Sequence, residues 1–300
     1  MEILKWLFDL SERYGTYLNI YKKIDNYENL LSYVCENGNL NQFKYLYNLS
    51  IKCGKEFDIF YKTDKNENLL MLDNCKQDLQ FLKYIYNLSI ALKKPLNIYQ
   101  KNNHGKNLIN MINNDFDVFI WLYNLSIELG QKFDIYQNLS QDPSYIENCF
   151  TNCFDEDISD DISDDNFKIA SWIYDKSILD QINMRPSISQ AFINLCNYGK
   201  FVIVKWIYNF NNNLLEKKDI ICGFIFSCYT KSFDLVLWIY NLQKFDLDEE
   251  ILSSCLSENI KNVNILKWLI NKIISMDINI DIDVVYSKKY TSGKVKNIQL

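Results

Sequence analysis

Residues 121–126 read Trp-Leu-Tyr-Asn-Leu-Ser, and variants of this hexapeptide recur along the whole chain. Its first half, an aromatic, an aliphatic and a second aromatic residue, is found at Trp6-Leu7-Phe8, Tyr45-Leu46-Tyr47, Tyr84-Ile85-Tyr86, Trp121-Leu122-Tyr123, Trp172-Ile173-Tyr174, Trp206-Ile207-Tyr208 and Trp238-Ile239-Tyr240, and fades into Trp268-Leu269-Ile270. Successive copies are 39, 39, 37, 51, 34, 32 and 30 residues apart. Such a period predicts stacked supersecondary repeats, each contacting only its neighbours, instead of one globular core.

Each repeat is predicted to hold two helices. In the second repeat, residues 28–35 form the first helix, and Gly38 is expected to end it in a left-handed conformation. The second helix is expected to run from about Leu40 to Ile51 and to be ended by Gly54. Its predicted apolar stripe consists of Leu40, Phe43, Leu46, Tyr47 and Ile51. The Asn-Leu-Ser triplets match a glycosylation sequon, but we interpret those that follow the aromatics as parts of a helix terminus.

A second fixed position lies fourteen residues after each repeat aromatic, where an Ile follows Asp or Asn. The six examples are Ile20, Ile59, Ile98, Ile135, Ile220 and Ile282. A polar residue, a buried Ile and then a polar run predict an extended loop that returns to the next helix.

These features resemble the ankyrin-repeat family, in the divergent style encoded by large AT-rich DNA viruses. The ankyrin unit pairs two helices with a projecting hairpin loop, at about 33 residues per repeat. Phe43-Lys44-Tyr45-Leu46 is similar to the family's second-helix motif, and Phe57-Asp58-Ile59-Phe60 is similar to its loop motif. The family's Thr-Pro-Leu-His tetrapeptide is absent, and the first three steps are longer than the usual period. The excess follows the second helix, which predicts one additional helical turn there.

The resemblance implies an all-α, ankyrin-like helical-hairpin solenoid of about seven to eight repeats over residues 1–286. The first repeat begins inside a second helix and is expected to be a half repeat. The polar tail 287–300 is expected to be poorly ordered. An insertion at 155–165, DEDISDDISDD, is acidic at seven of its eleven positions. We interpret it as a solvated loop; a calcium site or a docking loop for a basic partner are the alternatives.

The composition excludes several classes of function. The net charge is −6, with 32 basic and 38 acidic residues, and no overall basic face for nucleic acid is indicated. The sequence shows neither a membrane-spanning run nor a signal-peptide layout, so we expect a cytoplasmic protein, in the host cytoplasm if it is viral. His104 is the single histidine, and no phosphate loop or catalytic motif accompanies it. We therefore expect no enzyme activity and no cofactor.

The nine cysteines have a structural explanation. Six of them occupy one position near the end of the first helix of their repeat: Cys35, Cys75, Cys153, Cys196, Cys228 and Cys255. We expect these to be small buried hydrophobes in a reducing compartment, without disulfides. Cys149 and Cys153 form a CxxxC pair, but no second pair follows closely enough to predict zinc.

The aromatic ladder could be a base-stacking platform, but a basic groove is missing, and we expect the ladder, including Trp206, to form the inter-repeat core. The residue after the loop Ile is aromatic in the first four repeats: Tyr21, Phe60, Tyr99 and Tyr136. These rings could anchor a partner or pack against the neighbouring loop. Lys22, Lys62 and Lys101 lie on the same loops and would add polar contacts.

We therefore expect a monomeric protein–protein interaction scaffold or adaptor that binds a host or cellular protein through its concave face and loops. A substrate adaptor for a ubiquitin ligase and a structural virion component are the alternatives. The sequence does not identify the partner.

Overall fold

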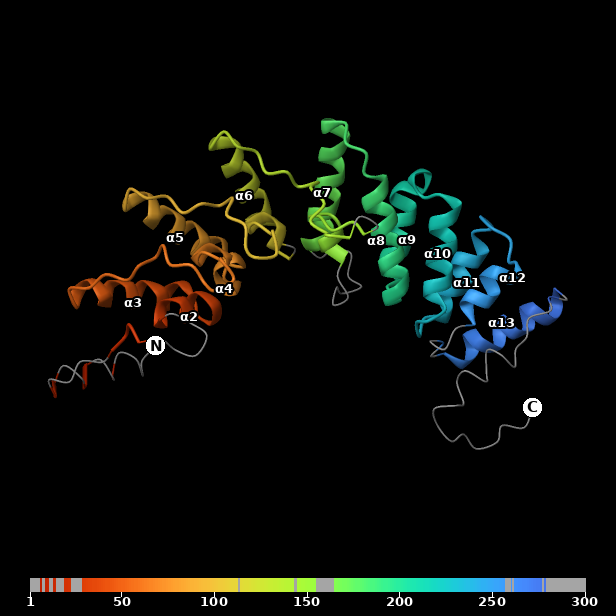
Figure 1. Cartoon of the computed structure of the whole chain (residues 1–300), viewed down its shortest axis with the longest axis horizontal. Coiled ribbons are helices and arrows are strands. Elements are labelled where there is room, and N and C mark those ends of the chain that lie inside the picture. The colour runs from red at the N-terminus through yellow and green to blue at the C-terminus, as the bar shows by residue number, and fades with distance from the viewer. Residues whose placement is uncertain are drawn as a thin grey trace. The chain divides into compact units, whose positions relative to one another are not determined.

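The computed structural model (Figure 1) describes residues 6, 9–10, 13–14, 19–22, 29–112, 114–142, 145–154, 165–256, 260, 262–276 and 278. All regular elements in these ranges are helical, which confirms the all-α prediction. No helix in the same ranges is both long enough and apolar enough to cross a membrane. The tail 287–300, residues 155–164 of the acidic insertion and most of the first repeat lie outside the described residues.

The chain divides into two compact units, Met1–Leu139 with Lys168–Ala170, and Ser140–Phe167 with Ser171–Leu300. The first unit holds α2 (Leu30–Asn37), α3 (Leu40–Lys52), η1 (Leu69–Met71), α4 (Asp73–Lys76), α5 (Leu79–Ala91), η2 (Leu108–Met111) and α6 (Phe116–Glu128). The second unit holds η3 (Thr151–Phe154), most of α7 (Asp165–Asp180), α8 (Arg185–Tyr198), α9 (Phe201–Asn211), η4 (Asn212–Leu214), α10 (Lys217–Ser227), α11 (Phe233–Asn241), α12 (Glu249–Cys255) and α13 (Val263–Ser275).

The second helices α3, α5 and α6 each begin at a side-chain cap. Asn39 accepts a hydrogen bond from the backbone N of Gln42 at 3.1 Å, and Asp78 and Asp115 cap α5 and α6 in the same way. Each cap satisfies an amide that has no partner within the helix. The caps explain why each of these three helices starts five residues before its repeat aromatic.

Two glycines end helices in the second repeat, and they do so for different reasons. Gly54 has φ +72° and follows α3, as predicted. Gly38 has φ −106° and ψ −151°, so the predicted left-handed conformation is wrong. A Cβ at Gly38 would lie 2.7 Å from Val34 Cγ1 and 2.8 Å from the Val34 carbonyl oxygen. Glycine is needed at position 38 because the turn passes close to α2, and not because of its backbone torsions.

The first helices are less regular than the sequence predicts. α2 is a complete short helix, but the third repeat has η1 followed by α4, and the fourth and fifth have only η2 and η3. In the fourth repeat only seven residues lie between the caps Asn107 and Asp115, and three of them are Asn, which competes with the helical backbone for hydrogen bonds. The second unit returns to regular helical pairs, with α8 packed on α9 and α10 on α11.

The aliphatic residue at the centre of each aromatic triplet forms the core. Its side chain is at most 1% exposed in every described copy: Leu46, Ile85, Leu122, Ile173, Ile207, Ile239 and Leu269. The first aromatic of the triplet is only partly buried in the second to eighth repeats, Trp206 among them, so the prediction of a buried Trp206 is wrong. On a helix the central residue faces the core directly, while its two neighbours point to either side of it.

The partly buried aromatics connect neighbouring repeats. Tyr86 meets Trp121 edge-on at 6.1 Å between ring centroids, and Tyr240 meets Trp268 at 5.0 Å. The second aromatic of one repeat thus contacts the first aromatic of the next, an arrangement that aromatic rings favour. The ladder serves stacking between repeats, as the sequence indicates.

In the three Asn-Leu-Ser triplets that follow a repeat aromatic, the serine fixes the loop that comes next. Ser89 is fully buried, and its hydroxyl donates to the Tyr86 carbonyl at 2.6 Å and accepts the amide of Leu96 at 3.0 Å. Ser50 and Ser126 make the equivalent pairs of bonds. The triplets lie at the ends of α3, α5 and α6, and the serine turns the chain back toward the next repeat.

The returning loops bury Ile20, Ile59, Ile98 and Ile135, as predicted. Ile220 is also buried, but it lies within α10, so the prediction of a loop at that position is wrong. The repeats of the second unit are shorter, and η4 with α10 takes the place of the long loop. Ile282 lies outside the described residues.

All six cysteines of the shared position are at 0% exposure. Burial raises the pKa of the Cys35, Cys75 and Cys196 thiols well above that of a free thiol. A side-chain hydrogen bond to Cys255, together with burial, raises the pKa of the Cys228 thiol. The prediction that these residues are buried hydrophobes is confirmed, and no disulfide links the described cysteines.

Candidate protein-binding surface

The four loop aromatics are held by a repeated turn. The backbone N of Tyr21, Phe60, Tyr99 and Tyr136 donates to the Asp or Asn side chain two residues earlier, at 3.1, 2.8, 2.9 and 3.1 Å. This side-chain turn explains why a polar residue always precedes the loop Ile. All four aromatics are partly buried.

Three of these rings contact the loop or helix end of the following repeat. Tyr99 lies 4.8 Å from the ring of Phe133, and its hydroxyl donates to the Ser126 carbonyl at 3.2 Å. Tyr21 lies 4.9 Å from Phe57. The Lys94 ammonium lies over the ring of Phe60, 4.3 Å from the ring centroid. Packing against the next repeat, one of the two predicted roles, is therefore present at these positions.

Lys22, Lys62 and Lys101 are exposed on the loops. The loops of the third and fourth repeats are bonded to each other. Asn66 Nδ2 donates to the Lys101 carbonyl at 2.8 Å, and the Asn103 amide donates to the Lys65 carbonyl at 2.9 Å. Each of these loops closes as a tight turn. In one of them the backbone N of Thr63 donates a hydrogen bond to the Glu67 carbonyl. Lys62 and Lys101 therefore lie on loops that are hydrogen-bonded to each other.

An apolar surface that the sequence analysis missed lies at the C-terminal ends of α3, α5 and α6. Its side chains and their exposed fractions are Ile51 51%, Ile90 47%, Leu92 38%, Ile127 52% and Leu129 50%. We call these five residues the helix-end surface. Within the first unit the three helices end on the same side, at the red-orange, orange and yellow tips in Figure 1. The predicted burial of Ile51 is wrong, because it lies on the additional helical turn beyond the buried serine.

The helix ends share one geometry. Cys53, Leu92 and Leu129 donate their amides to the carbonyl four residues earlier, and the next residue has a positive φ: Gly54 72°, Lys93 58° and Gly130 75°. This left-handed residue closes each helix. Because the closure is identical, the apolar side chains before it recur at equivalent places in three successive repeats.

The helix-end surface is bordered by cations. The charged side chains in residues 51–56, 90–95 and 127–132 are Lys52, Lys55, Lys93, Lys94 and Lys132, with Glu56 and Glu128, and all are exposed. Lys55 lies 4.7 Å from the Tyr21 ring centroid, and Lys132 lies 5.8 Å from that of Tyr123. Contacts of this kind position an ammonium group over a ring without neutralising its charge.

The second unit repeats this apolar position only in part. Ile178 of α7 and Ile274 of α13 also lie six residues after their repeat aromatic and are 60% and 69% exposed. The same position after α11 is Lys244. Three successive repeats carry the exposed Ile in the first unit, and single equivalents occur in the second.

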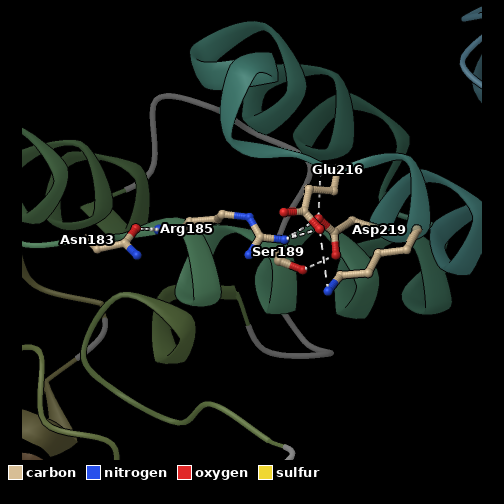
Figure 2. Close-up of polar contacts among 6 residues, drawn as sticks. Asn183, Arg185, Ser189, Glu216 and Asp219 are labelled. Atoms are coloured by element: carbon tan, nitrogen blue, oxygen red, sulfur yellow. Dashed lines mark hydrogen bonds and ion pairs between the residues drawn. The ribbon is translucent and has the colours of Figure 1, made fainter.

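A charged cluster joins α8 to α10 (Figure 2). Arg185 Nη2 lies 2.7 Å from Glu216 Oε2 and 3.7 Å from Asp219 Oδ2. The Asp219 carboxylate is 3% exposed and accepts the Ser189 hydroxyl at 2.6 Å and the Glu216 amide at 2.8 Å. Because the Asp219 carboxylate is bonded to Ser189 of α8 and to Glu216, which precedes α10, the cluster is a structural junction of the second unit.

Two other features of the sequence are the acidic insertion and the Cys149–Cys153 pair. Asp165, the last residue of the acidic insertion, is the first residue of α7, and the remainder lies outside the described ranges. Cys149 and Cys153 are both buried near η3. Across the described ranges, no three His, Cys, Asp or Glu residues are grouped so that they could hold a metal ion.

Comparison with models of known protein families gives no match, and comparison with curated protein sequences gives none either.

Proposed function

We propose that this chain is a non-catalytic protein-binding scaffold built from ankyrin-like repeats, acting as a cytoplasmic monomer on a host or cellular protein. The observation that carries the proposal is the helix-end surface, where aliphatic side chains stay about half exposed at the same position of three successive repeats. Contiguous exposed apolar residues rimmed by polar ones mark interaction sites. The paired loop turns and the repeated helix ends support the ankyrin-like description.

The proposal places the main contact at the helix ends, with the loops beside it. The loop aromatics Tyr21, Phe60 and Tyr99 already contact the next repeat, so they present only part of each ring to a partner. The helix-end side chains have about half their surface available. Covering apolar area contributes about 25 cal/mol per Å², so these aliphatic groups offer the larger gain on binding.

The test replaces Ile51, Ile90 and Ile127 together by Ser in a tagged chain used for affinity purification with mass spectrometry. We expect the affinity of the triple variant for its partner to fall roughly 100-fold, because each half-exposed Ile contributes about 1 kcal/mol on burial. The amount of captured partner should fall accordingly. Helicity by circular dichroism should persist, since exposed positions have small effects on folding.

The matched control changes Asn48, Asn87 and Asn124 to Ser, because these exposed residues lie one turn earlier on the same helices. The control should capture the partner as the natural chain does. Capture that survives the triple Ile change would eliminate the helix-end surface as the binding site.

A further inference from the structure

The helix-end surface combines apolar and cationic groups in one repeating segment. Three segments have the same layout: 51–56, 90–95 and 127–132. Each segment begins with an exposed Ile, passes the residue that closes the helix and contains exposed charged residues. The chemistry of the binding partner can therefore be inferred from both components.

The charge of this region is opposite to that of the chain. The three segments together contain five lysines and two glutamates, whereas the whole chain has a net charge of −6. Only Lys52 lies in the last turn of a helix, where the helix dipole favours a cation. The other four lysines, Lys55, Lys93, Lys94 and Lys132, follow the helix ends.

Two of these lysines are held in place by rings of the preceding repeat. Lys55 lies over Tyr21 and Lys94 over Phe60, at 4.7 and 4.3 Å from the ring centroids. Both lysines are exposed. The loop aromatics therefore act as supports that position cations beside the apolar side chains.

We infer that the partner segment is an acidic, amphipathic peptide, with aliphatic side chains on the helix-end surface and carboxylates facing Lys55, Lys94 and their neighbours. This inference rests on the proposed scaffold function and adds the chemical class of the partner. A basic segment would meet like charges, and a neutral apolar one would leave the lysines without complementary groups.

An anionic membrane is a less suitable occupant. The five aliphatic side chains are 38–52% exposed, so about half of each is covered by its own repeat. Membrane-binding surfaces insert apolar side chains several ångströms into the acyl boundary, commonly with Trp or Phe among them. No aromatic residue belongs to the helix-end surface.

Fluorescence anisotropy with the full chain tests the inference. The probe is a labelled peptide of about 16 residues that alternates two Glu with two Leu, compared with peptides in which Lys replaces Glu or Ser replaces Leu. We expect the Glu–Leu peptide to bind at least about tenfold more tightly than either comparison peptide, and its affinity to fall as salt is raised.

Variants locate the binding. Changing Lys55 and Lys94 to Gln should weaken binding of the Glu–Leu peptide about tenfold, whereas changing the exposed residues Lys217 and Lys244 of the second unit to Gln should leave it unchanged. Equal binding of the Lys–Leu peptide, loss caused only by the second-unit pair, or no binding of the Glu–Leu peptide would each overturn the inference. Binding to vesicles of phosphatidylserine and phosphatidylcholine in place of the peptide would also overturn it. The purification with the Ile variants judges the scaffold proposal separately.

Discussion

Replacing Phe43 by Ala is expected to destabilise the first unit by about 3–5 kcal/mol, the range for removing a fully buried Phe. Phe43 is 0% exposed on α3 and meets Phe81 at 5.5 Å and Tyr84 at 6.0 Å, both on α5. Its loss leaves a cavity at the boundary between two repeats. Hydrogen exchange with mass spectrometry should show faster exchange in α3 and α5, and urea unfolding should begin at lower concentration.

The matched change is Asn48 to Ala on the same helix, where the residue is exposed. This variant should lose no more than about 1 kcal/mol, because little buried area is removed. If the two variants unfold alike, the stacking of α3 on α5 by way of Phe43 is wrong.

Replacing Asp219 by Ala is expected to destabilise the second unit by about 2–4 kcal/mol, from lost hydrogen bonds to a charged group and a lost cap. Its buried carboxylate accepts hydrogen bonds from Ser189 of α8 and from the amide of Glu216, the residue before α10. The Arg185 ion pair adds little to this figure, because the Arg185 side chain is 31% exposed and water screens it. The measurement is hydrogen exchange across α8 and α10.

Glu216 to Gln is the control for the same cluster. Its side chain is 53% exposed while contacting the same guanidinium, so the variant should change stability by about 0–1 kcal/mol. A loss at Glu216 as large as at Asp219 would show that the ion pair, and not the buried carboxylate, holds α8 to α10.

Much of the fold is predictable from the sequence because the positions that recur in each repeat include those whose side chains are buried. The aromatic triplets locate every described second helix, and the shared cysteine position falls in the core in all six cases. Position-specific backbone geometry is less predictable. The sequence around Gly38 predicts a left-handed residue that ends a helix. In the structure the glycine is needed because its backbone passes close to Val34. Ile220 keeps the spacing of fourteen residues but lies in a helix. Spacing alone does not show that the loop before this position has become shorter.

The candidate surface was only partly predictable. The loop aromatics stand out as unusual, but their contacts with the next repeat depend on where successive loops lie in space. Ile51 fits the apolar stripe of α3 by periodicity, yet it is 51% exposed. The available signal was the longer period of the first repeats, which predicts an additional helical turn. An apolar residue on a turn that extends beyond its neighbours has nothing to cover it.

Cysteine labelling of the folded chain tests most directly whether the repeats stack as described. Cys53 is exposed, Cys222 is intermediate with its pKa raised mainly by burial, and the six cysteines of the shared position are fully buried. Brief treatment with iodoacetamide near neutral pH, followed by peptide mass spectrometry, should label Cys53 first. Cys35, Cys75, Cys153, Cys196, Cys228 and Cys255 should react only after unfolding. Labelling of those six at the rate of Cys53, in a chain that stays helical, would contradict the account.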